Sequence, residues 1–176
     1  MRDAFIEQMA MYTAYHRDVR NQLTHCVGVP AIAFALMLLL AYGPTMTLGG
    51  VEISFAHLLV VSLLLFYTVG SPVIGLIATC IYLPMAFLAQ WLAAEDLAFS
   101  LSIFAVCFFG GVALQLWGHV FEGRKPALLD NVLQIFLAPS FIIAEGLFAL
   151  GLQKDLHDII ESRSRAYAEQ PAGAAG

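Results

Sequence analysis

Charged side chains are scarce in this sequence. Asp, Glu, Lys and Arg make up only 12% of its 176 residues, whereas 60% of the residues are hydrophobic. A soluble domain of this size carries about twice that share of charge, so the composition excludes an ordinary soluble globular protein. The charges sum to −5. Because no basic stripe offsets this negative charge, a nucleic-acid partner is excluded as well.

Cysteines and linkers are also scarce. Cys26, Cys80 and Cys107 lie in apolar stretches without CxxC spacing, so we expect buried small residues rather than ligands or disulfides. No Ser-rich, Pro-rich or strongly charged linker divides the chain. This predicts a single membrane domain over residues 1–168 and a disordered tail at 169–176.

What the chain has instead is a series of long stretches with little or no charge. A membrane-crossing helix needs about 17 to 25 apolar residues, and residues 53–94 are long enough for two crossings joined at Gly70-Ser71-Pro72. Apolar and polar residues do not alternate strictly along these stretches, so the pattern favours helices over a membrane β-barrel. The predicted fold is therefore an all-α, polytopic transmembrane helical bundle of four to five spans. The spans are expected near 26–43, 55–70, 72–92, 98–118 and, as the fifth, 131–151.

The two ends of this series are less regular. Pro139 and Glu145 interrupt the fifth segment, so it either spans with a kink or re-enters the membrane. Residues 1–22 lack the apolar run of a signal peptide. They predict an amphipathic N-terminal helix that lies on the membrane surface or covers the cytoplasmic ends of the spans.

Basic residues predict the orientation, because cytoplasmic loops are enriched in Lys and Arg. They flank the first span on its N-terminal side and follow the fourth; these residues are Arg2, Arg17, Arg20, Arg124 and Lys125. The intervening outer loops hold only acidic charges, which are Glu52, Glu95 and Asp96. An integral, multi-pass membrane protein is expected, in the cytoplasmic (inner) membrane if the source is bacterial. The basic C-terminal segment favours the cytoplasm too, which conflicts with five full crossings.

Polar side chains that could bind a ligand or take part in catalysis gather in two short segments, at residues 15–25 and 115–122. Four crossings separate His25 from His119, and an even number of crossings returns the chain to the same side. His16, His25, His119 and Glu122 are therefore expected together at the cytoplasmic face. His119 and Glu122 share one helix face, whereas His16 and His25 converge only if the chain bends between them. Asn21 and Thr24 are candidate caps at that bend.

Imidazole and carboxylate ligands suit iron(II), zinc or copper, and two histidines with one carboxylate are typical of non-haem iron oxygenases. We therefore predict an Fe(II) site at His16, His25, His119 and Glu122. The alternative is that these groups are interfacial hydrogen-bonding residues. His57 begins the second span at the opposite face, and His157 is expected to be solvated. Glu145 must be neutral, paired or facing a cavity, with Arg124 as one possible partner.

The two polar segments carry a resemblance to a known family. YHRDVRNQLTHCVGVP at 15–30 and QLWGHVFEGRKPALLDNVLQIFLAPSF at 115–141, with a fainter match in EGLFALGLQKDL at 145–156, are similar to the Mpo-type 2-hydroxy-fatty-acid dioxygenases of fungi and their bacterial relatives, formerly a domain of unknown function. The distinctive pairing is H-x8-H-x2-G-x-P with Q-x3-H-x2-E-x3-P-A. The central spans match in hydrophobicity alone.

This resemblance implies an iron(II)-dependent membrane dioxygenase that uses O2 to remove one carbon from a 2-hydroxy long-chain fatty acid, a step of α-oxidation. It implies that His16, His25 and His119 bind the metal, with Glu122 as a fourth ligand or a supporting group. Further residues are expected to orient ligands or contact the substrate carboxylate. They are Asn21, Gln115 and Asn131 for the first role, and Arg17, Arg20, Arg124 and Lys125 for the second.

Two other function classes compete with this one. A non-catalytic transporter, or a lipid- or ion-binding membrane protein, would use the same polar cluster structurally. A di-iron lipid hydroxylase is the second alternative. Enzymes of that class resemble one another in having closely spaced histidine boxes, whereas this chain has 5 His and neither HxxxH nor HxxHH. Protein partners are not indicated by the sequence.

Overall fold

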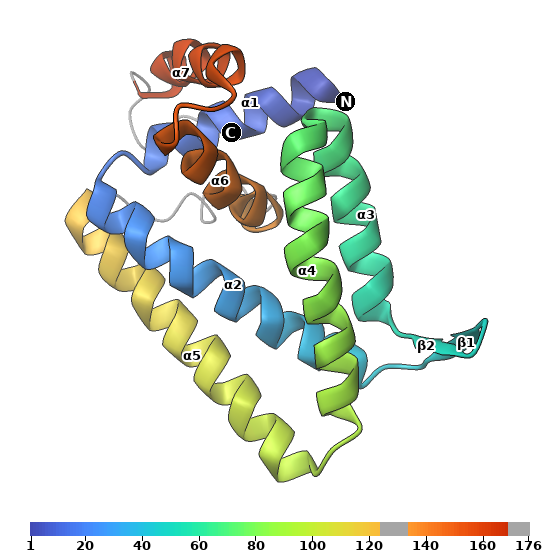
Figure 1. Ribbon diagram of the computed structural model, residues 1–176. Helices are drawn as coiled ribbons and strands as arrows, with labels where there is room; N and C mark the ends of the chain where they lie inside the picture. The colour runs from blue at the N-terminus through green and yellow to red at the C-terminus, as the bar shows by residue number, and fades with distance from the viewer. Residues whose placement is uncertain (124–133, 169–176) are drawn as a thin grey trace.

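The computed structural model describes residues 1–123 and 134–168. Within them, seven α-helices and one two-stranded hairpin follow one another along the chain (Figure 1). The elements are α1 (Arg2–Tyr15), α2 (Val19–Ala41), β1 (Met46–Leu48), β2 (Val51–Ile53), α3 (Phe55–Gly70), α4 (Pro72–Ala93), α5 (Leu97–Glu122), α6 (Gln134–Ala149) and α7 (Lys154–Ala168). The predicted all-α membrane bundle is confirmed. The predicted tail at 169–176 lies outside the described residues.

Three of the helices, α2, α4 and α5, are long and apolar enough to cross a membrane. The apolar α3 has 16 residues, a length of about 24 Å against a hydrocarbon core of about 30 Å. It joins α4 through the Ser71–Pro72 turn, as predicted, with the proline at the start of α4. In Figure 1, α3 and α4 stand side by side, and α1, α6 and α7 gather at one end of the molecule while the hairpin projects from the other.

Close contact between α2 and α5 depends on glycine. A Cβ at Gly111 would lie 2.9 Å from the backbone oxygen of Gly28, and a Cβ at Gly118 would overlap the side chain of Asn21. Such short approaches are possible only without side chains, as in other tightly packed membrane helices. The two helices consequently run together along much of their lengths (Figure 1). This contact sets His25 on α2 beside His119 on α5.

The N-terminal helix is shorter and more buried than predicted. It ends at Tyr15 rather than residue 22, and α2 begins at Val19 rather than residue 26. The apolar residues of α1 are buried, among them Phe5, Ile6, Met9, Ala10 and Tyr12. Because α7 packs on it as well, α1 is an internal layer over the end of the α3–α4 pair. The position of α1 relative to the membrane surface stays a prediction.

Complementary charge joins α7 to α1. The Arg163 guanidinium lies 3.0 Å from the Glu7 carboxylate and 3.5 Å from that of Asp3, and the Tyr167 hydroxyl also donates to Glu7. This hydrogen bond is the main reason that the pKa of Tyr167 is raised to about 12. The basic C-terminal segment therefore lies at the same end of the molecule as the N-terminus.

The fifth apolar segment does not run away from that end. Helix α6 contacts α1 or the start of α2 at its beginning, middle and end; the pairs are Gln134 with Gln8, Phe141 with Tyr12 and Glu145 with Gln22. Its axis then bends by 118° into α7. A bend of this size is compatible with a broken span as well as with a re-entrant segment, so both alternatives stay predictions for α6.

Two local features differ from the expectations drawn from the sequence. A hairpin occupies residues 46–53, where both turn glycines adopt positive φ, 59° at Gly49 and 83° at Gly50. This conformation suits a two-residue hairpin turn, and the Gly-Gly pair is its sequence signal. The expected burial of the cysteines is wrong: Cys26 and Cys80 are exposed and Cys107 is half-buried, because they lie on helix faces that other helices leave uncovered.

Candidate metal centre

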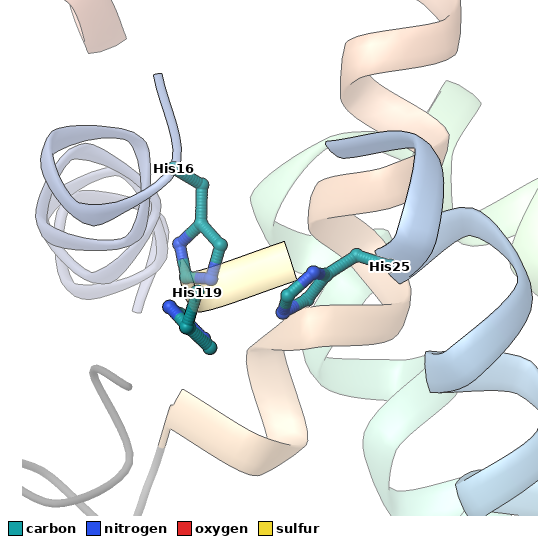
Figure 2. A group of neighbouring side chains, drawn as sticks. All are labelled: His16, His25 and His119. Atoms are coloured by element: carbon teal, nitrogen blue, oxygen red, sulfur yellow. The ribbon is translucent and has the colours of Figure 1, made fainter. Parts of the chain in front are cut away.

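Three histidines from three separate segments meet at one point. His16 follows α1, His25 lies in α2 and His119 lies near the end of α5; Figure 2 shows their rings turned toward one another. One ring nitrogen from each lies within 4.8 Å of the others, and the exposed fractions are 2%, 2% and 7%. The predicted convergence of these three residues is what the structure contains. It forms the only such group of His, Cys, Asp or Glu among the described residues.

Backbone carbonyl groups orient two of the rings. Nδ1 of His16 lies 2.9 Å from the Tyr12 carbonyl oxygen, and Nδ1 of His25 lies 2.9 Å from that of Asn21. A carbonyl oxygen can only accept, so Nδ1 carries the proton in both rings and Nε2 keeps its lone pair. This is the usual support for a metal-binding histidine. The predicted supporting role of Asn21 is thus carried by its backbone for His25.

A bend at residues 16–18 brings His16 to His25, and its cap differs from the one predicted. Asp18, rather than Asn21 or Thr24, is the N-cap of α2, and its side chain accepts from the Arg20 backbone N–H. The Arg20 side chain also binds this carboxylate, and these hydrogen bonds lower the pKa of Asp18 to about 2. An ionised carboxylate at a helix N-terminus is favourable, so the α2 helix starts there.

Glu122 holds the same bend from α5. Its carboxylate accepts from the backbone N–H groups of Arg17 at 3.0 Å and Asp18 at 2.9 Å, and from the Asn21 amide at 3.0 Å. It does not belong to the histidine group. Of the four predicted ligands, the described residues therefore bring together the three imidazoles, and Glu122 takes the position of the predicted alternative, a group that supports the site. Glu122 links the end of α5 to the segment that carries His16.

The environment of the rings fits a metal ion. Nε2 of His16 and Nδ1 of His119 are buried without a hydrogen-bond partner among the described residues. Burial lowers the pKa of His16 to about 3, and the neighbouring His25 acts in the same direction. The ring is therefore neutral near pH 7 and offers a lone pair. Buried imidazole nitrogens without partners are costly unless a ligand such as a divalent transition metal satisfies them.

An apolar cavity of about 280 Å³ opens beside the histidines. All three rings line one end of it, and aliphatic and aromatic side chains from helices α1 to α6 line the remainder. Gln115 and Gln134 are the amide groups in this lining. A mostly apolar pocket with a few convergent polar groups is the usual form of a small-molecule site.

Gln134 is the residue that the sequence-based prediction missed. It is 1% exposed, its Nε2 donates to Gln8 at 2.7 Å, and its Oε1 is buried without a partner among the described residues. A polar residue at the start of an apolar segment was the signal that could have found it. The prediction named Asn131 instead, and Asn131, Arg124 and Lys125 lie outside the described residues.

The two predicted cationic residues near the site are engaged elsewhere. Arg17 pairs with Glu161 at 3.1 Å and donates to Ser164, while Arg20 pairs with Asp18 at 2.7 Å and lies over the Phe121 ring. Neither lines the apolar cavity. Gln115, which was predicted to orient ligands, does line this cavity.

The remaining titratable candidates have other surroundings. His57 caps α3, where Ser54 and His57 satisfy each other's backbone groups. The exposed His157 packs on Phe148. Glu145 accepts from Gln22 at 3.2 Å and lines a separate polar pocket; its predicted partner Arg124 lies outside the described residues.

Comparison with known proteins identifies the family of the chain. The sequence profile of the family described as 2-hydroxy-palmitic acid dioxygenase Mpo1-like matches residues 3–149, a range that contains all three histidines. The 2-hydroxy-palmitic acid dioxygenase MPO1 of Saccharomyces cerevisiae is 35% identical over 158 residues, covering 88% of this chain and 86% of the yeast protein. No solved structure matches. The chain belongs to the Mpo1-like family of 2-hydroxy-palmitic acid dioxygenases.

Proposed function

We propose that this protein is an iron(II)-dependent membrane dioxygenase that shortens 2-hydroxy fatty acids by one carbon. The observation that carries the proposal is the position of three buried imidazoles at the end of an apolar cavity. An acid with a long alkyl chain suits such a cavity, and a polar head suits the histidine end. The name of the yeast relative supports the same substrate class.

His16, His25 and His119 would hold the iron. Iron(II), when bound, would supply redox chemistry with O2 that no protein side chain offers. Tyr12 and Asn21 orient two of the ligands through their carbonyls, and Glu122 fixes the bend between them. The buried Oε1 of Gln134 is an acceptor for the substrate's 2-hydroxyl, and the Gln115 amide is a donor for its carboxylate.

The apolar wall has a second role in this proposal. By excluding water beside the histidines it protects reactive species from side reactions and keeps the alkyl chain desolvated during turnover. The reaction would cleave the bond between C1 and C2 of the acid, leaving C2 as the carboxyl carbon of the shortened product. With O2 as the oxidant the atoms balance when C1 leaves as carbon dioxide together with one water molecule.

The histidine end is proposed to face the cytoplasm, with four membrane crossings between His25 and His119 and, in a bacterium, in the inner membrane. Two features support this orientation. Basic residues of the N-terminal segment and of α7 share that end, and the opposite end has the acidic loops.

Metal analysis and turnover together test the function. Detergent-purified protein should contain near-stoichiometric iron that is lost in His119→Ala and kept in His57→Ala, whose histidine is buried outside the group. Incubation with 2-hydroxypalmitate should yield the acid one carbon shorter in air and none under argon. Negligible iron in the wild type and in both variants, or no shortened acid in air, would exclude the proposal in favour of a non-catalytic lipid or ion carrier.

A further inference from the structure

The apolar cavity follows α2 in the direction away from the histidines. Its lining residues on this helix recur at helical spacing along one face and are His25, Val29, Ile32, Ala33, Leu36 and Met37. Helix α5, which packs against α2, also lines the cavity, with His119, Gln115, Val112 and Phe108. Helix α3 runs the other way, so Tyr67 lies toward the histidines while Leu59 and Val60 lie toward the far end.

Two helices give the same depth for this cavity. From His25 to Met37 the rise along α2 is about 18 Å, and from His119 to Phe108 along α5 it is about 16 Å, at 1.5 Å per residue. An extended alkyl chain advances about 1.2 Å per bond, by the geometry that gives an extended polypeptide about 3.6 Å per three bonds. From C2 to its terminal methyl, 2-hydroxypalmitate is therefore about 17 Å long and 2-hydroxyoctanoate about 7 Å long.

From this match we infer that the cavity measures the acyl chain, with the far-end residues Met37, Leu59 and Phe108 setting the preferred length. This inference rests on the proposed function, because it takes the polar head of a 2-hydroxy acid to lie at the histidines. The methyl end of a palmitate-length tail then contacts Met37, which is buried at 6% exposure. Shorter tails leave the far end empty and lose apolar contact; longer tails meet the far wall.

Side chains that obstruct the cavity at different depths test this. Ala33, about 12 Å from His25 along α2, is half-buried and lines the cavity, so Ala33→Phe obstructs it beyond the reach of an octanoate tail but within that of palmitate. Val112→Phe does the same from α5, about 10 Å from His119, and serves where one variant fails to fold. Leu39→Phe is the matched control, because Leu39 lies on α2 but is 53% exposed outside the cavity.

Binding is measured under argon, without turnover, for 2-hydroxyoctanoate, 2-hydroxydodecanoate, 2-hydroxypalmitate and 2-hydroxybehenate. The wild type and Leu39→Phe should prefer 2-hydroxypalmitate. Either obstructing variant should weaken its binding at least about tenfold, since several methylenes lose burial, while affinity for 2-hydroxyoctanoate stays within about twofold. Met37→Ala should move the preference toward 2-hydroxybehenate.

The outcomes separate this inference from the proposed function. The inference is overturned if the wild-type affinity does not depend on chain length. It is also overturned if both Ala33→Phe and Val112→Phe bind 2-hydroxypalmitate as tightly as the wild type does. Either result would place the tail in the bilayer, even if turnover is normal. Length-dependent binding that shifts in the obstructing variants supports it. If such binding occurs but no shortened acid forms in air, only the proposed reaction fails.

Discussion

His16 is held from several sides although it belongs to no helix. Its ring stacks on Tyr12 with centroids 4.0 Å apart and an interplanar angle of 12°, and its Nδ1 is bonded to the Tyr12 carbonyl. The adjacent backbone N–H of Arg17 is bonded to Glu122. Such a fixed ring would lose little further freedom on binding a metal, and this makes His16 the most informative of the three proposed ligands to remove.

Replacement of His16 by alanine is expected to weaken metal binding by more than about 100-fold, because one of the three proposed ligands is lost. Mutation of a residue that only supports a ligand already lowers metal affinity by about 10- to 100-fold. This is checked by measuring the metal content of the His16→Ala protein after dialysis, with the His157→Ala protein as the control. His157 is exposed and outside the group, so its variant should retain wild-type metal. Equal metal in the two variants would exclude His16 as a ligand.

Replacement of Glu122 by glutamine distinguishes a ligand from a group that holds the bend. Three donors share this carboxylate, so we expect a loss of about 1–3 kcal/mol in the free energy of unfolding and a metal affinity within about tenfold of the wild type. Denaturation and metal titration of the same preparation provide both values. A metal loss as complete as that of His119→Ala would instead make Glu122 a ligand.

Replacement of Gln134 by leucine should raise the KM for 2-hydroxypalmitate by about tenfold, since a hydrogen bond to the substrate is worth about 1 kcal/mol or more, and should leave the metal content unchanged. Gln90→Leu is the control, because Gln90 has a buried, unpartnered Oε1 among the described residues but does not line the cavity. Equal KM values for both variants would remove Gln134 from substrate binding.

At the scale of elements, the α2–α5 contact decides whether the histidines meet. Gly111 on α5 faces Gly28 of α2, whereas a Cβ at the neighbouring Gly110 would meet no atom of the described residues within 4 Å. The two adjacent glycines therefore differ in what they face. Comparing substitutions at these two positions therefore tests the effect of helix spacing separately from the effect of losing a glycine.

Alanine at Gly111 is expected to separate α2 from α5, with a loss of about 1–3 kcal/mol in stability from overpacking and reduced metal affinity. Alanine at Gly110 should leave both unchanged or raise stability slightly, since alanine favours helix more than glycine does. Thermal unfolding and metal titration of the two variants check this. Identical behaviour would show that the close approach does not determine the spacing of His25 and His119.

At the scale of the whole molecule, α1, α6 and α7 lie at one end and the hairpin lies at the other (Figure 1). His16, which follows α1, places the histidine group at the end with α1. Helix α7 reaches this end through the bend after α6 and pairs with α1. The cavity at the histidines is lined by α1 to α6, and α7 packs on α1 at the same end. A membrane orientation assigned to one of these elements applies to all of them.

Single cysteines introduced into a background without the three native ones should report this orientation. A cysteine at exposed Thr47 of the hairpin should react with a membrane-impermeant maleimide in intact cells, and one at exposed Ser162 of α7 only after lysis. The reverse pattern would place the histidine end outside, and reaction at both positions in intact cells would contradict a crossing bundle.

The sequence by itself determined the membrane-helix class, the turn at Gly70-Ser71-Pro72 and the grouping of His16, His25 and His119. These features follow from the length and the number of the charge-free segments, and both can be read directly along the chain. The tertiary structure decided the rest. Glu122 is drawn to backbone N–H groups rather than to the histidines, and α6 stays beside α1, because partners distant in sequence compete for each polar group. The cavity along α2 is likewise made by side chains of six helices, and no single segment contains it.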